Sequence, residues 1–164
     1  MKRLIIAATV ILVTSGAWAD EGGEARLTVT DVEQVFTLAE SSDYSGSPEF
    51  PSVSLALRGP RDGNATDVVS VMLGFAIHGD EASSPEARLL RRVGDETEWL
   101  FCYSEAERGG LTVALEEHAI DGNFMSVQGQ FSCNFGTSEN YGRDIDLSDP
   151  LAVSGQFNVT LERL

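Results

Sequence analysis

The sequence predicts an all-β fold: an antiparallel β-sandwich, or a flattened barrel, of about eight short strands. Many segments alternate apolar and polar residues with a period of two, which is typical of strands with one buried face. Short runs rich in Gly, Pro, Asp and Asn separate these segments, as they do in antiparallel folds. The chain that follows a predicted leader, residues 20–164, also has the length of one domain.

The first 19 residues are predicted to be a cleavable signal peptide. Basic residues near the start precede an apolar run over residues 4–13, and Ala17-Trp18-Ala19 then supplies a small-x-small cleavage site. The apolar run is shorter than the roughly 20 residues that a membrane-spanning helix needs. We therefore expect a secreted protein of the bacterial periplasm, whose mature chain begins at Asp20 and forms a single β-sandwich domain.

The next element, residues 26–38, has two interpretations. Leu27 and Val29 share one parity, whereas the apolar residues from Val32 onward share the other. A strand interrupted by a β-bulge would produce this switch of parity. A short helix over residues 31–39 is the alternative.

Five further strands are predicted, and three of them, 53–57, 68–77 and 151–161, place a row of apolar side chains on one face. All five lie at residues 53–57, 68–77, 88–93, 97–103 and 151–161. A turn around Gly94-Asp95 joins the third of these strands to the fourth. Four polar segments are expected to be long connections: residues 39–52, 59–67, 79–87 and 136–150.

One hairpin can be given a register, between strands predicted at 111–120 and 124–135. Residues that face each other in an antiparallel pair point to the same side of the sheet. A two-residue loop would place apolar Leu115 opposite a solvent-facing glutamine. A three-residue loop, Asp121-Gly122-Asn123, instead pairs Leu115 with Gly129, so the sequence predicts the three-residue loop.

The only two cysteines, Cys102 and Cys133, are expected to form a disulfide, because an exported chain meets an oxidising environment. The bond would close a loop of about 30 residues and stabilise the fold by roughly 3–4 kcal/mol. Disulfide Cα atoms lie within about 6.8 Å, which is less than two strand spacings of about 4.8 Å. The strand at 97–103 should therefore either pair directly with 124–135 or lie in the opposing sheet.

The mature chain is strongly acidic. Its only lysine lies in the leader, so nine arginines face 26 acidic residues and the net charge is −17. Nucleic acid and anionic membranes are excluded as partners on this ground, because phosphate contacts require cations. We expect no stable membrane insertion after signal cleavage. A basic protein or a glycan is the partner considered, and the alternative is that the charge serves only solubility.

The first candidate binding site is aromatic. Trp99, Phe101 and Tyr103 share one face of the strand at 97–103, and Cys102 lies on the other. If Cys102 points inward to meet Cys133, the three aromatic residues form an outward row that could stack on sugars or dock a protein. The favoured alternative is that the aromatic residues lie in the core and that the disulfide forms at an edge or through a bulge.

The second candidate is a calcium site in the acidic loop. Asp144, Asp146 and Asp149 lie close together in the sequence, and calcium prefers clustered oxygen ligands on a flexible loop. The segment lacks the Gly at the sixth position and the Glu at the twelfth of an EF-hand loop, so a solvated loop is the favoured interpretation. His78 and His118 each have acidic neighbours and could assist zinc binding, but ordinary surface positions are the favoured interpretation for both.

No catalytic motif is present: the chain has no G-x-S-x-G, no H-E-x-x-H and no Gly-rich phosphate loop. The sequence therefore predicts a non-catalytic binding or accessory module, not an enzyme. An inhibitor or immunity protein that neutralises a basic periplasmic enzyme is one alternative. A calcium-stabilised structural module is the other.

Overall fold

The computed structural model describes residues 23–164, so the predicted leader lies outside the described residues. The described chain is nearly all β and confirms the predicted fold class. Its ten strands are β1 (Glu24–Val29), β2 (Val32–Leu38), β3 (Asp43–Ser47), β4 (Phe50–Arg58), β5 (Val68–His78), β6 (Glu81–Val93), β7 (Glu96–Tyr103), β8 (Thr112–Asp121), β9 (Phe124–Thr137) and β10 (Asp146–Arg163). A single 3-10 turn, η1 (Ala106–Arg108), follows β7. Within residues 23–164, no helix has the length and apolar character that a membrane crossing requires.

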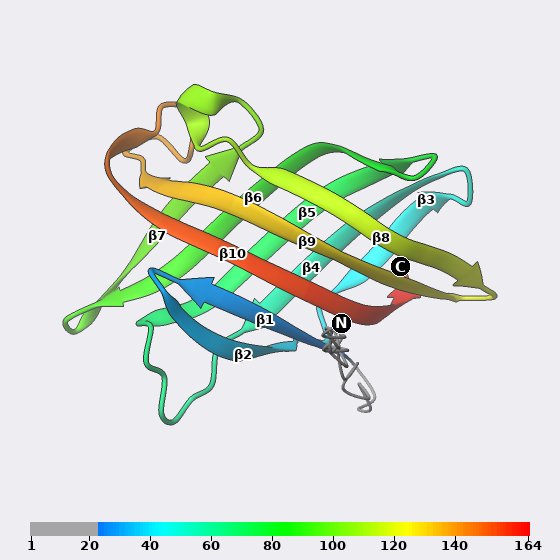
Figure 1. Cartoon of the computed structure of the whole chain (residues 1–164), viewed down its shortest axis with the longest axis horizontal. Helices are drawn as coiled ribbons and strands as arrows, with labels where there is room; N and C mark the ends of the chain where they lie inside the picture. Colours follow the sequence, from blue (N-terminus) through cyan, green and yellow to red (C-terminus); the bar gives the residue numbers. More distant parts are fainter. Residues whose placement is uncertain (1–22) are drawn as a thin grey trace, which may run out of the picture.

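The strands form one sheet that folds back on itself as a flattened barrel (Figure 1). The front sheet has the order β2-β1-β10-β9-β8, and the back sheet has the order β3-β4-β5-β6-β7. Short pairings join the two sheets at their margins: β10 with β3, β2 with β4, and β7 with β9. The strands of the two layers cross obliquely in Figure 1, as they do in strongly twisted sandwiches.

The parity switch near the N-terminus arises from a hairpin, which neither sequence interpretation anticipated. β1 ends at Val29 and β2 begins at Val32, and these two residues pair directly. Thr30 and Asp31 form the two-residue turn and both have positive φ, 44° and 68°. Two positive φ values give the turn that matches the twist of adjacent strands. The turn lacks the usual Asn-Gly or Asp-Gly signature, so it could not be predicted from the sequence.

The β8–β9 hairpin corrects the predicted loop. Its loop has two residues, Gly122 and Asn123, because Asp121 pairs with Phe124. The predicted pairing of Leu115 with Gly129 is nevertheless present, because a β-bulge falls between Leu115 and Glu117. The bulge inserts one residue into β8 and restores the apolar parity that the shorter loop would have lost.

Several segments predicted as polar connections are partly strands. β3 lies inside the segment predicted as a connection at 39–52, and β6 begins at Glu81, seven residues earlier than predicted. β10 begins at Asp146 and not at 151. Most residues of these segments are polar and at least partly exposed, although Tyr44 of β3 is buried in the core.

The core lies between the two sheets and is lined by the inward residues of almost every strand. Phe131 and Phe157 illustrate how it closes. A Cβ atom on Gly155 would lie 2.8 Å from the Phe131 ring, and one on Gly129 would lie 2.9 Å from the Phe157 ring. Each glycine therefore leaves the space that a neighbouring strand's aromatic ring fills. The largest fully buried side chains are Phe36, Phe135, Phe157, Leu27, Leu55, Leu57, Leu73, Ile77, Leu89, Leu100, Met125 and Leu161.

Candidate binding groove

The disulfide fixes which face of β7 is buried. Cys102 and Cys133 are bonded, with their Cα atoms 6.5 Å apart, and both lie in the core. β7 pairs directly with β9 through Leu100 opposite Thr137 and Phe101 opposite Gly136. The expected disulfide is therefore present, and both predicted arrangements apply, because β7 belongs to the opposing sheet and also pairs directly with β9 at the margin of the two sheets.

The aromatic row accordingly points outward, but it is not an exposed row. Leu100 and Cys102 are buried on the core face, which places Trp99, Phe101 and Tyr103 on the outer face of the back sheet. Trp99 is 45% exposed, whereas Phe101 is only 6% exposed and Tyr103 is half-buried. Neither sequence interpretation is fully correct: the residues lie outside the core, yet a loop covers two of the three.

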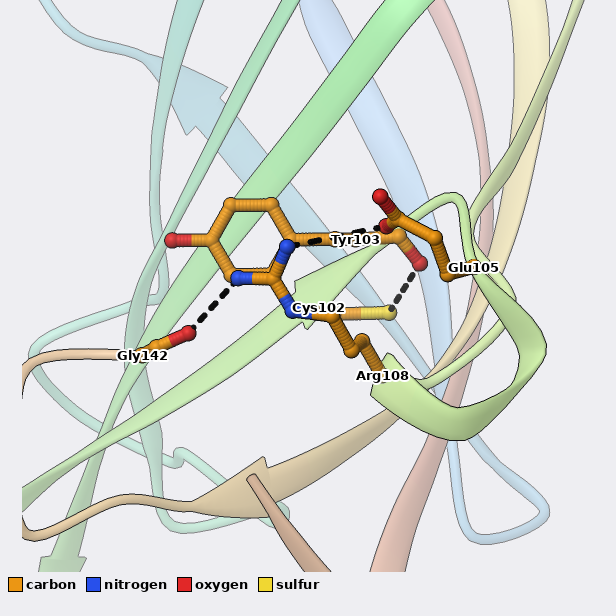
Figure 2. Close-up of polar contacts among 5 residues, drawn as sticks. All are labelled: Cys102, Tyr103, Glu105, Arg108 and Gly142. Atoms are coloured by element: carbon orange, nitrogen blue, oxygen red, sulfur yellow. Dashed lines mark hydrogen bonds and ion pairs between the residues drawn. The ribbon is translucent and has the colours of Figure 1, made fainter. Parts of the chain in front are cut away.

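The covering segment is the loop between β9 and β10, held in place by Arg108. The guanidinium group of Arg108 lies over the Tyr103 ring, 3.8 Å from its centroid (Figure 2). It also donates a 2.8 Å hydrogen bond to the carbonyl of Gly142 and lies 3.7 Å from the carboxylate of Glu105. The Arg108 side chain thus connects the loop to the outer face of β7, because its guanidinium group stacks on Tyr103 and donates a hydrogen bond to Gly142.

The same loop displays an aromatic side chain that the sequence analysis missed. Tyr141 is 90% exposed and has a φ of 59°, a conformation that bulky residues rarely adopt. The loop enforces it: the Gly142 N–H donates to the Ser138 hydroxyl at 2.8 Å, and the Asn140 amide donates to Asp144 at 2.6 Å. A strained, exposed aromatic residue is a candidate for function. The sequence signal was one aromatic residue in a loop of mostly polar residues.

Trp99 and Tyr141 line one groove, which we call the aromatic groove. Its volume is about 500 Å³, within the range of small-ligand sites. The carboxylate of Glu98 accepts a 2.8 Å hydrogen bond from the Arg91 guanidinium group, and Glu139 is exposed. The groove therefore combines aromatic faces with carboxylates. Its lining residues are Glu98, Trp99, Phe101, Thr137, Ser138, Glu139 and Tyr141.

The candidate metal ligands of the described residues do not form a coordination site. No group of three or more His, Cys, Asp and Glu residues within residues 23–164 is arranged to hold a metal ion. Asp144 instead accepts from Asn140, and Asp146 accepts a 2.8 Å hydrogen bond from the Ser148 N–H. That backbone hydrogen bond, with a further one from the Ser148 side chain, holds the pKa of Asp146 below its usual value.

The two histidines lie on different strands. His78 ends β5, where its ring lies 5.2 Å from that of Phe50, and His118 lies on β8. The structure therefore brings neither the aspartates nor the histidines into a ligand set.

Comparison with known proteins adds no assignment. No protein-family model, no curated protein and no solved structure is significantly similar to this chain.

Proposed function

We propose that this chain is a secreted, periplasmic, non-catalytic binding module whose aromatic groove receives a basic segment of a partner protein. The observation that carries the proposal is that exposed Trp99 and Tyr141 line one groove together with Glu98 and Glu139. Each cation–π contact between an Arg or Lys side chain and an exposed aromatic face contributes about 0.5–1 kcal/mol of favourable interaction energy. Carboxylates beside those faces attract the same cations.

The overall charge supports a basic partner. The mature chain carries −17, so a cationic protein is drawn to it over a distance set by the ionic strength. The carboxylate of Glu98 is already matched by Arg91, which leaves Glu139 and the general field to attract the ligand. Charge thus sets the rate of encounter, and the aromatic groove sets where the ligand is held.

The test uses the tryptophan itself. Trp99 is the single tryptophan of the mature chain, so its emission reports directly on the groove when an oligoarginine peptide is titrated. We expect a change in emission on binding, and an affinity that falls at least tenfold between about 0.1 and 1 M salt, because the screening length falls from about 10 to about 3 Å. Salt-independent binding would count against the proposal.

Two variants locate the ligand. Tyr141→Ala removes one aromatic wall while Trp99 remains as the reporter, and it should weaken binding about fivefold. Phe124→Ala removes another exposed aromatic residue, 53% exposed at the β8–β9 turn, and should leave binding unchanged. Equal losses in the two variants would place the ligand elsewhere.

An inhibitor or immunity protein is the second candidate, and the charge of −17 is the observation that favours it. In that case the partner is a basic periplasmic enzyme such as a muramidase, and binding blocks its activity. The mature chain should then inhibit a basic muramidase at near-equimolar ratio in low salt. Binding without inhibition would leave only the binding module.

A further inference from the structure

The outer face of the front sheet carries mainly uncharged polar side chains, and the aromatic groove does not include them. The cross-strand register aligns them in two rows that run over β1, β10, β9 and β8. The first row has short side chains: Thr28, Ser154, Ser132 and Thr112. The second row has three long side chains and one short one: Arg26, Gln156, Gln130 and Ala114.

These rows make a trough, which we call the polar trough. Two neighbouring hollows of about 440 and 350 Å³ share Thr28, Ser132 and Ser154 of the short row, so they are parts of one depression. The long row forms one wall of the first hollow, and Asn134 lies along the second. The trough crosses three strand spacings of about 4.8 Å, which gives it a length of about 14 Å.

Hydroxyl and carboxamide groups make up most of the polar lining of the trough, and the charged side chains, Arg26, Asp31 and Glu33, lie at its β1–β2 end. Hydroxyl and carboxamide groups both donate and accept hydrogen bonds, so they match a ligand that is itself a dense array of hydroxyl groups. One pair already bonds in this manner: the hydroxyls of Thr112 and Ser132 lie 2.9 Å apart. The one cation that lines it, Arg26, forms an ion pair with Glu33 at 3.7 Å. We infer that the polar trough is a binding site for a neutral, linear polysaccharide.

Other ligand classes fit the trough less well. Nucleic acid needs several cations at its binding site. Arg26 is the one cation in the lining of the first hollow, and it already forms an ion pair with Glu33. A protein partner needs large apolar or aromatic anchors, and the only aromatic residue in the lining, Phe131, is 3% exposed. An extended peptide needs a free strand edge, but β9 and β10 are each paired on both sides along the trough.

Strand stability accounts for only part of this composition. Cross-strand stabilisation comes mainly from aromatic, β-branched and oppositely charged pairs and from Thr–Thr or Thr–Ser hydrogen bonds, of which Thr112 opposite Ser132 is one. Ser154 opposite Ser132 and Gln156 opposite Gln130 belong to none of these classes. The chain is rich in acidic residues, with 26 in all, yet the central strands of the trough carry none in these two rows. The two rows therefore carry no carboxylate, and the carboxylates of the lining, Asp31 and Glu33, come from the β1–β2 turn and β2 at one end of the trough.

The test is affinity electrophoresis of the mature chain in native gels containing hydroxyethyl cellulose, soluble starch, dextran or glycol chitin. This method detects weak binding to a polymer as retardation of the band. We expect at least one neutral polymer to retard the chain. The double variant Gln130→Ala/Gln156→Ala should weaken that retardation about tenfold, because it removes two of the three long side chains of the wall. The control Ser52→Ala, an exposed residue on β4 in the back sheet, should bind as the parent does.

The variants also separate this site from the aromatic groove. Trp99→Ala should leave retardation unchanged, and the double variant should leave oligoarginine binding unchanged. A thermal melt of each variant shows that loss of binding is not loss of the fold, and Gln156→Glu offers a second change of nearly identical shape. Retardation by none of the four polymers, or retardation lost in Trp99→Ala and kept in the double variant, overturns the inference.

Discussion

The two outer faces of this flattened barrel differ although the same period-two alternation produces both. The outer face of the back sheet carries Trp99, Phe101 and Tyr103, and the chain covers much of it with the 138–145 loop. The outer face of the front sheet carries hydroxyl and carboxamide side chains and is left open as the polar trough. The outer face of the back sheet is therefore partly buried beneath the loop, whereas the outer face of the front sheet meets solvent.

The comparison shows that a strand's outward residues do not by themselves define a binding face. Phe101 points outward yet is 6% exposed, because Arg108 and Gly142 hold a loop against it. Ser154 and Ser132 point outward and stay exposed, because no segment crosses them. Which outward residues can meet a ligand depends on what the intervening loops cover.

The largest expected effect comes from removing the bond that joins the back sheet to the front sheet at β7 and β9. Cys102→Ala/Cys133→Ala should lower the free energy of unfolding by about 3–4 kcal/mol, from the loop entropy that the bond removes from the unfolded chain. Urea denaturation followed by circular dichroism measures it. A loss below about 1 kcal/mol would mean that the β7–β9 contact holds without the bond.

The second prediction separates the covered face from an ordinary turn. Gly142→Ala should cost about 2 kcal/mol, because the residue has a φ of 84° and its Cβ would lie 2.8 Å from the Phe101 ring. Gly122→Ala is the matched control: its φ is 62°, and its Cβ would meet no atom within 4 Å, so only backbone strain of about 1 kcal/mol is expected.

The readout is the urea midpoint together with Trp99 emission. Only Gly142→Ala should change the emission, because only that change lifts the loop beside Trp99. Equal destabilisation by the two variants, with unaltered emission, would show that the loop does not pack on β7 as described.

The third prediction concerns the open face. Gln130→Ala/Gln156→Ala should change the free energy of unfolding by no more than about 0.5 kcal/mol, since both side chains are exposed. A loss above about 1 kcal/mol would show that the polar trough is part of the stabilising structure and would weaken the case for a ligand there. Thermal and urea denaturation of the double variant and of Ser52→Ala supply the comparison.

The smallest effect concerns Asp146, at the end of the loop that covers the aromatic face. Its pKa is lowered in the folded state by the Ser148 hydrogen bonds, so the stabilisation is present above the usual carboxyl pKa and is lost as the pH falls through the folded pKa. Asp146→Asn should therefore be slightly less stable than the parent at pH 7, and the difference should vanish in strong acid. A difference that stays constant with pH would assign it to shape and not to charge.

The fold class and most strands could be predicted from the sequence because alternation is a local property. The disulfide pairing was also predictable, since a chain with only two cysteines offers one pairing. The N-terminal hairpin was not, because Thr30 and Asp31 adopt positive φ without a typical turn sequence. The three-residue loop was wrong because a bulge at Glu116 restored the parity that the prediction tried to preserve.

The candidate sites were less predictable. Trp99 was found from the parity of one strand, but Tyr141 reaches the same groove from a loop 42 residues later in the chain. The polar trough required the register of four strands, and no local pattern gives that register.

The amino-acid sequence by itself determined the alternation, the acidity and the two sulfurs that join β7 to β9. Those properties follow from residue types and their spacing, which act over a few residues or over the whole chain. Only the tertiary structure decided which outward side chains are covered and which lie side by side, because both depend on contacts between segments far apart in the sequence. Arg108 over Tyr103 and Ser154 beside Ser132 are two such contacts, and they separate the covered face from the open one.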